Sequence, residues 1–150
     1  MVIERAVTGD AGEILTLQRA AYVTEAQLYG DPYIPPLVES VEQVRKVIDT
    51  ATVLKAVEGT RIVGAVRGQL QNTTCLVGRL VVAPDRQGTG IGTALLNALH
   101  AELQDAEAFD LYTGHLSDGN LRLYRRLGYR ETSRERMDDH LTLVHLRRTP

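Results

Sequence analysis

The residues of this chain that could do chemistry gather around one glycine-rich segment, Gln87–Thr93, which reads QGTGIGT. The stretch before it, Leu80–Val82, is continuously apolar, as in a strand that is covered on both faces. A helix is expected after it, because Leu96, Leu99 and Leu103 recur at helical spacing. Glycines between a strand and a helix let the backbone approach an anion, and the helix N-terminus adds partial positive charge. The segment therefore predicts a phosphate or pyrophosphate site.

Two familiar phosphate sites fit this segment poorly. A nucleoside-triphosphate loop needs a lysine and a hydroxyl residue after its last glycine, but Thr93-Ala94 follow Gly92 here. A dinucleotide fingerprint reads G-x-G-x-x-G, and Thr93 stands where the third glycine belongs. Asp110 does lie where a ribose-binding acid would be expected. Six predicted elements precede the segment, however, and no repeated parallel unit is visible.

A third interpretation depends on two motifs taken together. Gln87, Gly90 and Gly92 match the signature Arg/Gln-x-x-Gly-x-Gly/Ala between a strand and a helix. A strand, an asparagine, a Leu-Tyr pair and a Leu-Gly-Tyr ending follow: Leu111–Thr113, Asn120, Leu123-Tyr124 and Leu127-Gly128-Tyr129. With both motifs in order, the whole chain resembles the GCN5-related N-acetyltransferase (GNAT) family.

The resemblance implies acetyl-CoA, or another acyl-CoA, as the acyl donor, and no metal. The backbone N–H groups of Gly88–Thr93 would hold the pyrophosphate, and the backbone of Leu80–Val82 would pair with the pantetheine arm like an added strand. In the family, a bulge in this strand opens a slot for the arm. Asn120 and Tyr124 share one helical face, which looks onto the thioester. The implied cofactor-binding residues are Leu80, Val81, Val82, Gln87, Gly88, Thr89, Gly90, Ile91, Gly92, Thr93, Asn120 and Tyr124.

The implied reaction is direct transfer of an acetyl group to a primary amine, which attacks the thioester carbonyl. An oxyanion then forms and needs a donor, such as the N–H of Val81 or Val82. The thiolate that leaves is helped by a proton donor, and Tyr124 is expected to supply it, since a phenol can donate at neutral pH. The alternative is a domain of the same fold that binds acyl-CoA without catalysis.

A general base is harder to assign, because the strand Leu76–Val82 carries no carboxylate and only Arg79 as a charged residue. His115, just after a predicted strand, is a candidate because an imidazole titrates near neutral pH. Glu39 is another candidate, and a chain of water molecules is a third. The acceptor is a small amine or a peptide amine. In the family, its pocket borders the region of Tyr22, Tyr29 and Tyr33.

The expected fold is of the α/β (α+β) class, with a mixed, mostly antiparallel sheet flanked by helices in the order βααβββαβαββ. Two capping patterns, Asp10 with Glu13 and Ser40 with Gln43, predict helix starts, and Gly30–Leu37 is expected to be a loop. The predicted strands are Val2–Val7, Thr52–Val57, Arg61–Leu70, Leu76–Val82, Phe109–Thr113, Tyr129–Thr132 and Leu141–Leu146. A short helix is expected over Asp118–Leu127, ended by Gly128.

Composition narrows the class of protein. The chain has 150 residues, with 17 Lys and Arg against 19 Asp and Glu, a balance that argues against a nucleic-acid binder. A lone Cys75 excludes an internal disulfide, and no apolar run approaches the ~20 residues of a membrane span. With no signal-peptide pattern at the start, we expect a single cytoplasmic domain over residues 1–150. Many members of the family pair through sheet edges or C-terminal strands, so the resemblance implies that Leu141–Leu146 could support a homodimer.

Overall fold

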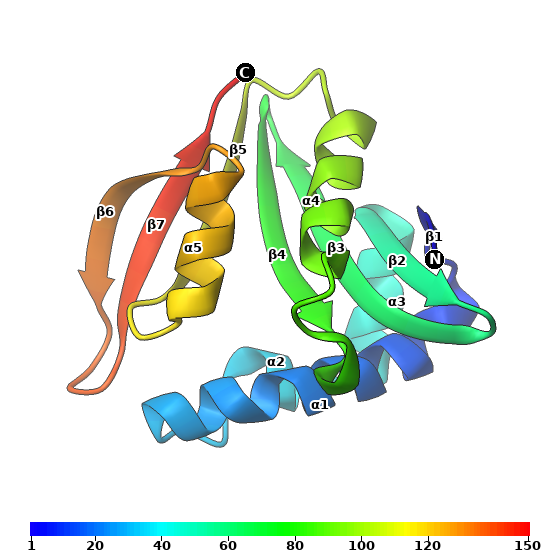
Figure 1. Cartoon of the computed structure of the whole chain (residues 1–150), viewed down its shortest axis with the longest axis horizontal. Coiled ribbons are helices and arrows are strands. Elements are labelled where there is room, and N and C mark those ends of the chain that lie inside the picture. The colour runs from blue at the N-terminus through cyan, green and yellow to red at the C-terminus, as the bar shows by residue number, and fades with distance from the viewer.

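One seven-stranded sheet, in the order β1-β2-β3-β4-β5-β7-β6, organises residues 1–150 in the computed structural model (Figure 1). The strands are β1 (Val2–Arg5), β2 (Thr52–Glu58), β3 (Arg61–Gln71), β4 (Thr74–Val82), β5 (Ala108–Gly114), β6 (Arg130–Arg136) and β7 (Thr142–Arg148). Only β4 and β5 pair in parallel, and every other pair is antiparallel. The mixed, mostly antiparallel sheet predicted from the sequence is therefore confirmed.

Five α-helices surround the sheet: α1 (Ala11–Tyr29), α2 (Pro35–Val38), α3 (Val41–Thr50), α4 (Ile91–Glu102) and α5 (Asp118–Arg126). Figure 1 shows α4 and α5 in front of the sheet, α3 behind it, and α1 along its lower end. The fully buried Leu95, Leu96 and Leu99 place the apolar side of α4 in the core. No helix combines the length and the apolar content that a membrane crossing requires.

Two local predictions differ from the structure: the helix start at Asp10 is confirmed but its side-chain cap is not, and an expected loop contains a helix. The Asp10 carboxylate does not cap α1: it accepts from the backbone N–H of Val7 at 2.8 Å and binds Lys55 at 2.8 Å, so a tertiary ion pair replaces the cap. The expected loop contains the short helix α2, because a proline is tolerated in the first helical turn, where its missing N–H is not needed. The other capping pattern is confirmed, since the N–H of Gln43 donates to Ser40 Oγ at 3.1 Å.

The centre of the sheet splits where β4 and β5 diverge. These strands pair only from Thr74 to Leu76 on β4, with Ala108 to Asp110 on β5, and Figure 1 shows them apart beyond that point. In β4 the register to β3 shifts where Arg79 adopts a φ of 49°, a left-handed conformation that is unusual for a residue other than glycine. This irregularity is the β4 bulge that the family resemblance implies.

Candidate functional site

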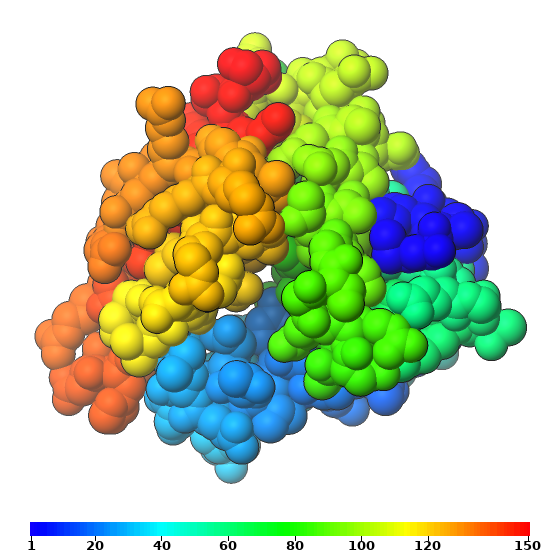
Figure 2. All heavy atoms as spheres, viewed as in Figure 1, coloured from blue at the N-terminus to red at the C-terminus, as the bar shows by residue number.

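Two cavities meet at the split in the sheet. The larger, about 550 Å³, lies between the end of β4, the glycine-rich segment and α5. The smaller, about 310 Å³, lies between α1, α2, β4, β5 and β7. Tyr22, Glu25, Leu80 and Asn120 line both. Figure 2 shows the hollow between α4, α5 and α1, so the two cavities form one continuous site with a junction at these four residues.

The glycine-rich segment forms one end of the larger cavity. Gly88 and Gly90 have φ values of 76° and 89°, and Gly90 caps the N-terminus of α4. The first N–H groups of a helix have no acceptor within it, so those of Ile91, Gly92 and Thr93 remain available to a ligand. A side chain at Gly92 would lie 3.4 Å from Leu123 on α5, so its absence lets the two helices approach.

Most of the predicted cofactor-binding residues line this larger cavity; Tyr124 lines only the smaller one, and Thr89 and Ile91 line neither. Gln87, Gly88, Gly90, Gly92 and Thr93 lie in its wall, together with Leu80, Val81, Val82 and Asn120. The Ile91 side chain is buried in the core, and the Thr89 hydroxyl donates to the carbonyl oxygen of Arg86 at 2.5 Å. Only the backbone N–H groups of these two residues remain as candidates for ligand contact.

Two arginines of α5 add positive charge to the same cavity. Arg122 and Arg126 both line it, and Arg126 Nη2 donates to Thr93 Oγ1 at 3.1 Å. From the sequence alone, this basic stretch could equally be a solvated helix face. Its position beside the free N–H groups of α4 fits a phosphate-bearing ligand.

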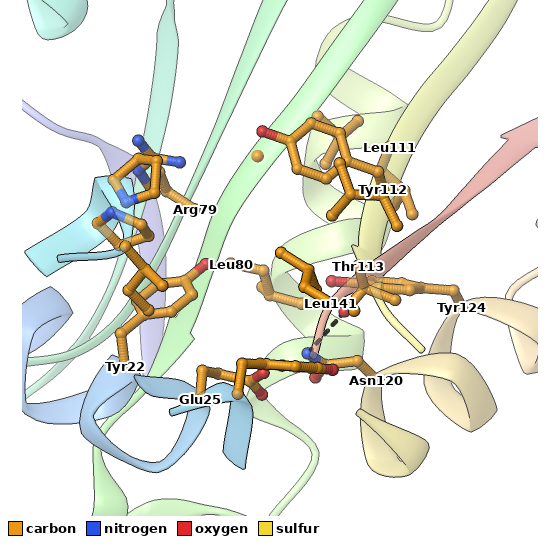
Figure 3. Close-up of a pocket in the computed structure, with 18 of the residues that line it drawn as sticks. Tyr22, Glu25, Arg79, Leu80, Leu111, Tyr112, Thr113, Asn120, Tyr124 and Leu141 are labelled. Atoms are coloured by element: carbon orange, nitrogen blue, oxygen red, sulfur yellow. Dashed lines mark hydrogen bonds between the residues drawn. The ribbon is translucent and has the colours of Figure 1, made fainter. Parts of the chain in front are cut away.

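Tyr124 faces the smaller cavity from α5 (Figure 3). Burial raises the pKa of its phenol above the ordinary value, and no protein hydrogen bond holds the hydroxyl. The phenol therefore stays protonated at neutral pH and is free to donate to a ligand. Asn120, one turn earlier, donates to Thr113 Oγ1 across a long 3.4 Å contact.

Glu25 is a site residue that sequence reasoning missed. Its Oε2 accepts from Ser117 Oγ at 2.7 Å, and Ser117 Oγ lies 2.7 Å from the Tyr29 hydroxyl. The Tyr29 hydroxyl also accepts from the N–H of Leu116 at 3.0 Å. A Cβ at Gly114 would lie 2.0 Å from that hydroxyl, so only glycine leaves room for this chain of contacts. The sequence signal was the shared helical face of Tyr22, Glu25 and Tyr29.

His115 lines neither cavity. Its Nδ1 accepts from the backbone N–H of Thr142 at 3.0 Å, which ties the ring to the start of β7. This placement gives His115 no contact with the junction, so the structure offers no support for it as the general base.

Glu39 is also outside both cavities. Its carboxylate accepts from Arg67 Nη1 and Nη2 at 3.0 and 2.9 Å and from Gln18 Nε2 at 2.9 Å. Burial raises the pKa of Glu39, but the hydrogen bonds from Arg67 and Gln18 outweigh it and hold the pKa below its ordinary value. Cys75 is buried, and burial raises its thiol pKa to about 11, so it is no nucleophile at neutral pH.

The fold and the site define a class of protein that comparison with known families identifies. The family described as Acetyltransferase (GNAT) domain matches residues 29–150. This chain belongs to that family, the GCN5-related N-acetyltransferases, whose known activity is acyl transfer.

One curated protein and several solved structures are similar to this chain. UPF0157 protein YqkA of Bacillus subtilis (strain 168) is 28% identical over 138 residues, which are 91% of this chain and 40% of that protein. This chain therefore spans less than half the length of that relative. The Escherichia coli ribosomal-protein-S18-alanine N-acetyltransferase shares the fold with a TM-score of 0.83 at 17% identity, over 99% of this chain and 92% of that one. YncA of Salmonella typhimurium, solved with its cofactor acetyl-CoA, has a TM-score of 0.80 at 17% identity, over 99% and 93%.

Proposed function

We propose that this chain transfers an acetyl group from acetyl-CoA to a primary amine by direct attack on the thioester. The observation that carries the proposal is the junction of the two cavities: one offers N–H groups and arginines to a pyrophosphate, and the other is mostly apolar and contains Tyr124. A donor in the first cavity and an acceptor in the second would meet at Leu80. The acetyl-CoA found in YncA, which has the same fold, supports the choice of donor.

Donor binding would use the backbone more than side chains. The N–H groups of Gly88–Thr93 would hold the pyrophosphate, aided by Arg122 and Arg126. Beyond Leu76, the edge of β4 has no pairing with β5, so the pantetheine arm can add to that edge as an extended strand would. In this proposal the thioester would lie at Leu80–Val82, between Asn120 and Tyr22.

Glu25 is our proposed general base. It lies at the junction, Ser117 orients its carboxylate, and no arginine or lysine side chain binds it. An amine that enters as an ammonium ion must lose a proton before it attacks, and Glu25 can accept that proton directly or through one water molecule. His115 and Glu39 occupy other positions, so Glu25 replaces both in the proposal.

The atoms balance without a covalent enzyme intermediate. The neutral amine nitrogen attacks the thioester carbon, and a backbone N–H in Leu80–Val82 stabilises the oxyanion. The carbon–sulfur bond then breaks, and Tyr124 gives its proton to the sulfur of CoA. Glu25 passes the ammonium proton on to water, which leaves its carboxylate free to accept the extra proton of the nitrogen as the amide forms. Water then takes this second proton from Glu25 and returns a proton to Tyr124. Holding both substrates at one junction supplies much of the acceleration.

Thermal unfolding with acetyl-CoA, CoA or NAD tests donor binding. A ligand at a hundredfold above its Kd stabilises the folded state by about 2.7 kcal/mol. The proposal predicts such a shift with acetyl-CoA and CoA and none with NAD, together with thiol release when an amine is added. Binding without thiol release on any amine would favour the alternative, a non-catalytic acyl-CoA-binding domain. No shift with acetyl-CoA would overturn both.

A further inference from the structure

The smaller cavity carries two charged side chains of opposite sign. Of the residues that line it, only Glu25 and Arg79 have acidic or basic side chains. Glu25 also lines the donor cavity, whereas Arg79 does not. In Figure 3, Arg79 lies across the cavity from Tyr124 and Asn120, with Glu25 on a third side. The cavity therefore has one negative and one positive position, separated along its length.

Arg79 has no hydrogen-bond partner in the protein. Its Nε is completely buried without an acceptor, and its nearest carboxylate oxygen, Glu39 Oε1, is 3.6 Å away. Glu39 is already bound by both Nη atoms of Arg67 and by Gln18. Two guanidinium groups therefore share one carboxylate, which leaves one positive charge uncompensated. A largely buried guanidinium whose side chain makes no hydrogen bond is costly, so it is a strong position for an anion from outside the chain.

The bulge in β4 is what brings Arg79 to this position. At a φ of 49°, its backbone is in the left-handed region, which costs about 1–3 kcal/mol in a residue other than glycine. Leu80, next in the chain, lies at the junction of the two cavities. The same bulge thus determines the position of Leu80, where the thioester is proposed to lie, and the position of the arginine that lines the smaller cavity.

Most of the remaining wall of the cavity is apolar. Pro35 and Pro36 come from α2, Tyr112 from β5, and Met137 and Leu141 from the turn before β7. These side chains can bury a hydrocarbon or aromatic group, and the volume of about 310 Å³ suits a small molecule.

We propose that the acceptor is a small amino carboxylate with an apolar body, whose carboxylate binds Arg79 while its amine faces Glu25 and the thioester. This inference rests on the proposed acetyl transfer and adds the class of acceptor to it. An arginine fork binds a carboxylate through two parallel hydrogen bonds, which fixes the direction of the molecule as well as its charge. The amine end then reaches the junction, and the apolar body packs on Pro35, Pro36 and Tyr112.

Matched acceptor pairs test this class. L-phenylalanine is compared with L-phenylalaninamide, and ε-aminocaproate is compared with its carboxamide. The amine and the carboxylate are further apart in ε-aminocaproate than in phenylalanine. Thiol release from acetyl-CoA gives kcat and KM for each. We expect kcat/KM to favour the free carboxylate of at least one pair by about tenfold or more, the size expected of a charge-assisted hydrogen bond. The amine of phenylalaninamide is less basic, so more of it is neutral at a given pH, and that bias opposes the predicted preference.

Variants then assign the preference to Arg79. In R79Q, kcat/KM for the carboxylate should exceed that for the carboxamide by less than about threefold, and the change should lie mainly in KM. R79K should keep part of the preference, because lysine retains the positive charge. The control is R45Q, which removes an exposed arginine of α3 that pairs with Glu42. Acetyl-CoA binding, followed by thermal unfolding, reports whether each variant is folded.

Each outcome decides between the two proposals. Equal or better turnover of the carboxamides by the wild-type protein would overturn the acceptor class and leave acetyl transfer intact. Acetylation of other amines, with no acetylation of either amino carboxylate, would also overturn the acceptor class and leave acetyl transfer intact. A preference that survives in R79Q would remove Arg79 from the account. Failure to bind acetyl-CoA would overturn the proposed function itself.

Discussion

At the scale of single residues, Tyr124 and Glu25 come from different helices, and in the proposed mechanism they divide the proton transfers between them. Burial raises the pKa of Tyr124, which keeps the phenol protonated and able to donate. Ser117 holds the carboxylate of Glu25 at 2.7 Å. An acid and a base on opposite sides of one bond allow the amine to be deprotonated and the thiolate to be protonated in the same site.

Replacing the phenol isolates its role. Y124F removes the donor and keeps the ring, so we expect kcat to fall by about a hundredfold with little change in acetyl-CoA binding. Steady-state thiol release and calorimetric titration of acetyl-CoA measure the two quantities. Y33F is the control, because Tyr33 is exposed and lines neither cavity. An unchanged kcat in Y124F would remove this residue from the mechanism.

Glu25 gives a second test. E25Q removes the base and should lower kcat by about a hundredfold, whereas S117A only releases the carboxylate from its partner and should have a smaller effect. E42Q, on the exposed side of α3, is the control. The measured quantity is kcat at saturating acetyl-CoA. If E25Q keeps wild-type turnover, a water chain or another group must accept the proton.

The sequence predicted one part of the site and missed another for a physical reason. Gln87, Gly90 and Tyr124 belong to motifs with fixed local spacing, so their positions follow from the chain itself. Glu25 reaches the junction only because α1 crosses the split sheet, and Arg79 reaches the smaller cavity only because β4 bulges; both features depend on long-range contacts. His115 directly follows β5, which lines the smaller cavity, but its ring contacts the backbone of Thr142 instead.

At the scale of elements, the turn into α4 depends on backbone shape. Gly90 needs a φ of 89°, so G90A strains the turn by about 1–2 kcal/mol and moves the N–H groups that would hold the pyrophosphate. Gly59, in the turn between β2 and β3, has a φ of 60° and lies outside both cavities. G59A should therefore destabilise the fold by a similar amount without weakening the binding of acetyl-CoA. Calorimetric titration that found equal Kd values in the two variants would contradict this function of the segment.

Elements with local signals were predicted well, and those that depend on neighbours were not. The Ser40–Gln43 box starts α3 as expected, because both partners lie within one turn. Asp10 fails as a cap because Lys55, far along the chain, binds it. Strand β6 extends beyond its predicted end, to Arg136, and all of its residues are exposed. No alternation of apolar residues could mark it, so its pairing with β7 alone defines it.

At the scale of the whole molecule, His100 links the stability of the fold to pH. Its ring lies 4.7 Å from that of Phe109, and Nε2 is 2.7 Å from the Tyr129 hydroxyl. Burial lowers the pKa of His100 from 6.5 to about 4. Between about pH 4 and 6.5, His100 is therefore protonated in the unfolded chain but not in the folded chain. The free energy of unfolding must rise with pH across that range.

The prediction is a loss of stability on acidification. The contribution of neutral His100 is complete above about pH 6.5 and declines as the pH falls towards 4. Urea unfolding at several pH values should show this slope in the wild-type protein and less of it in H100Q. H140Q, which alters an exposed histidine, should retain it. An identical pH dependence in the H100Q variant would show that His100 is not the group responsible.

The most direct test of the account is the chemical fate of the acetyl group. The purified protein is mixed with acetyl-CoA and a panel of amines, and released thiol and acceptor mass are measured together. The account predicts one acetylated amine for each thiol released, with both greatly reduced in Y124F. Thiol release without acetylated amine would mean that water, not an amine, is the acceptor. Bound acetyl-CoA that is never consumed would contradict the central claim that this site catalyses acetyl transfer.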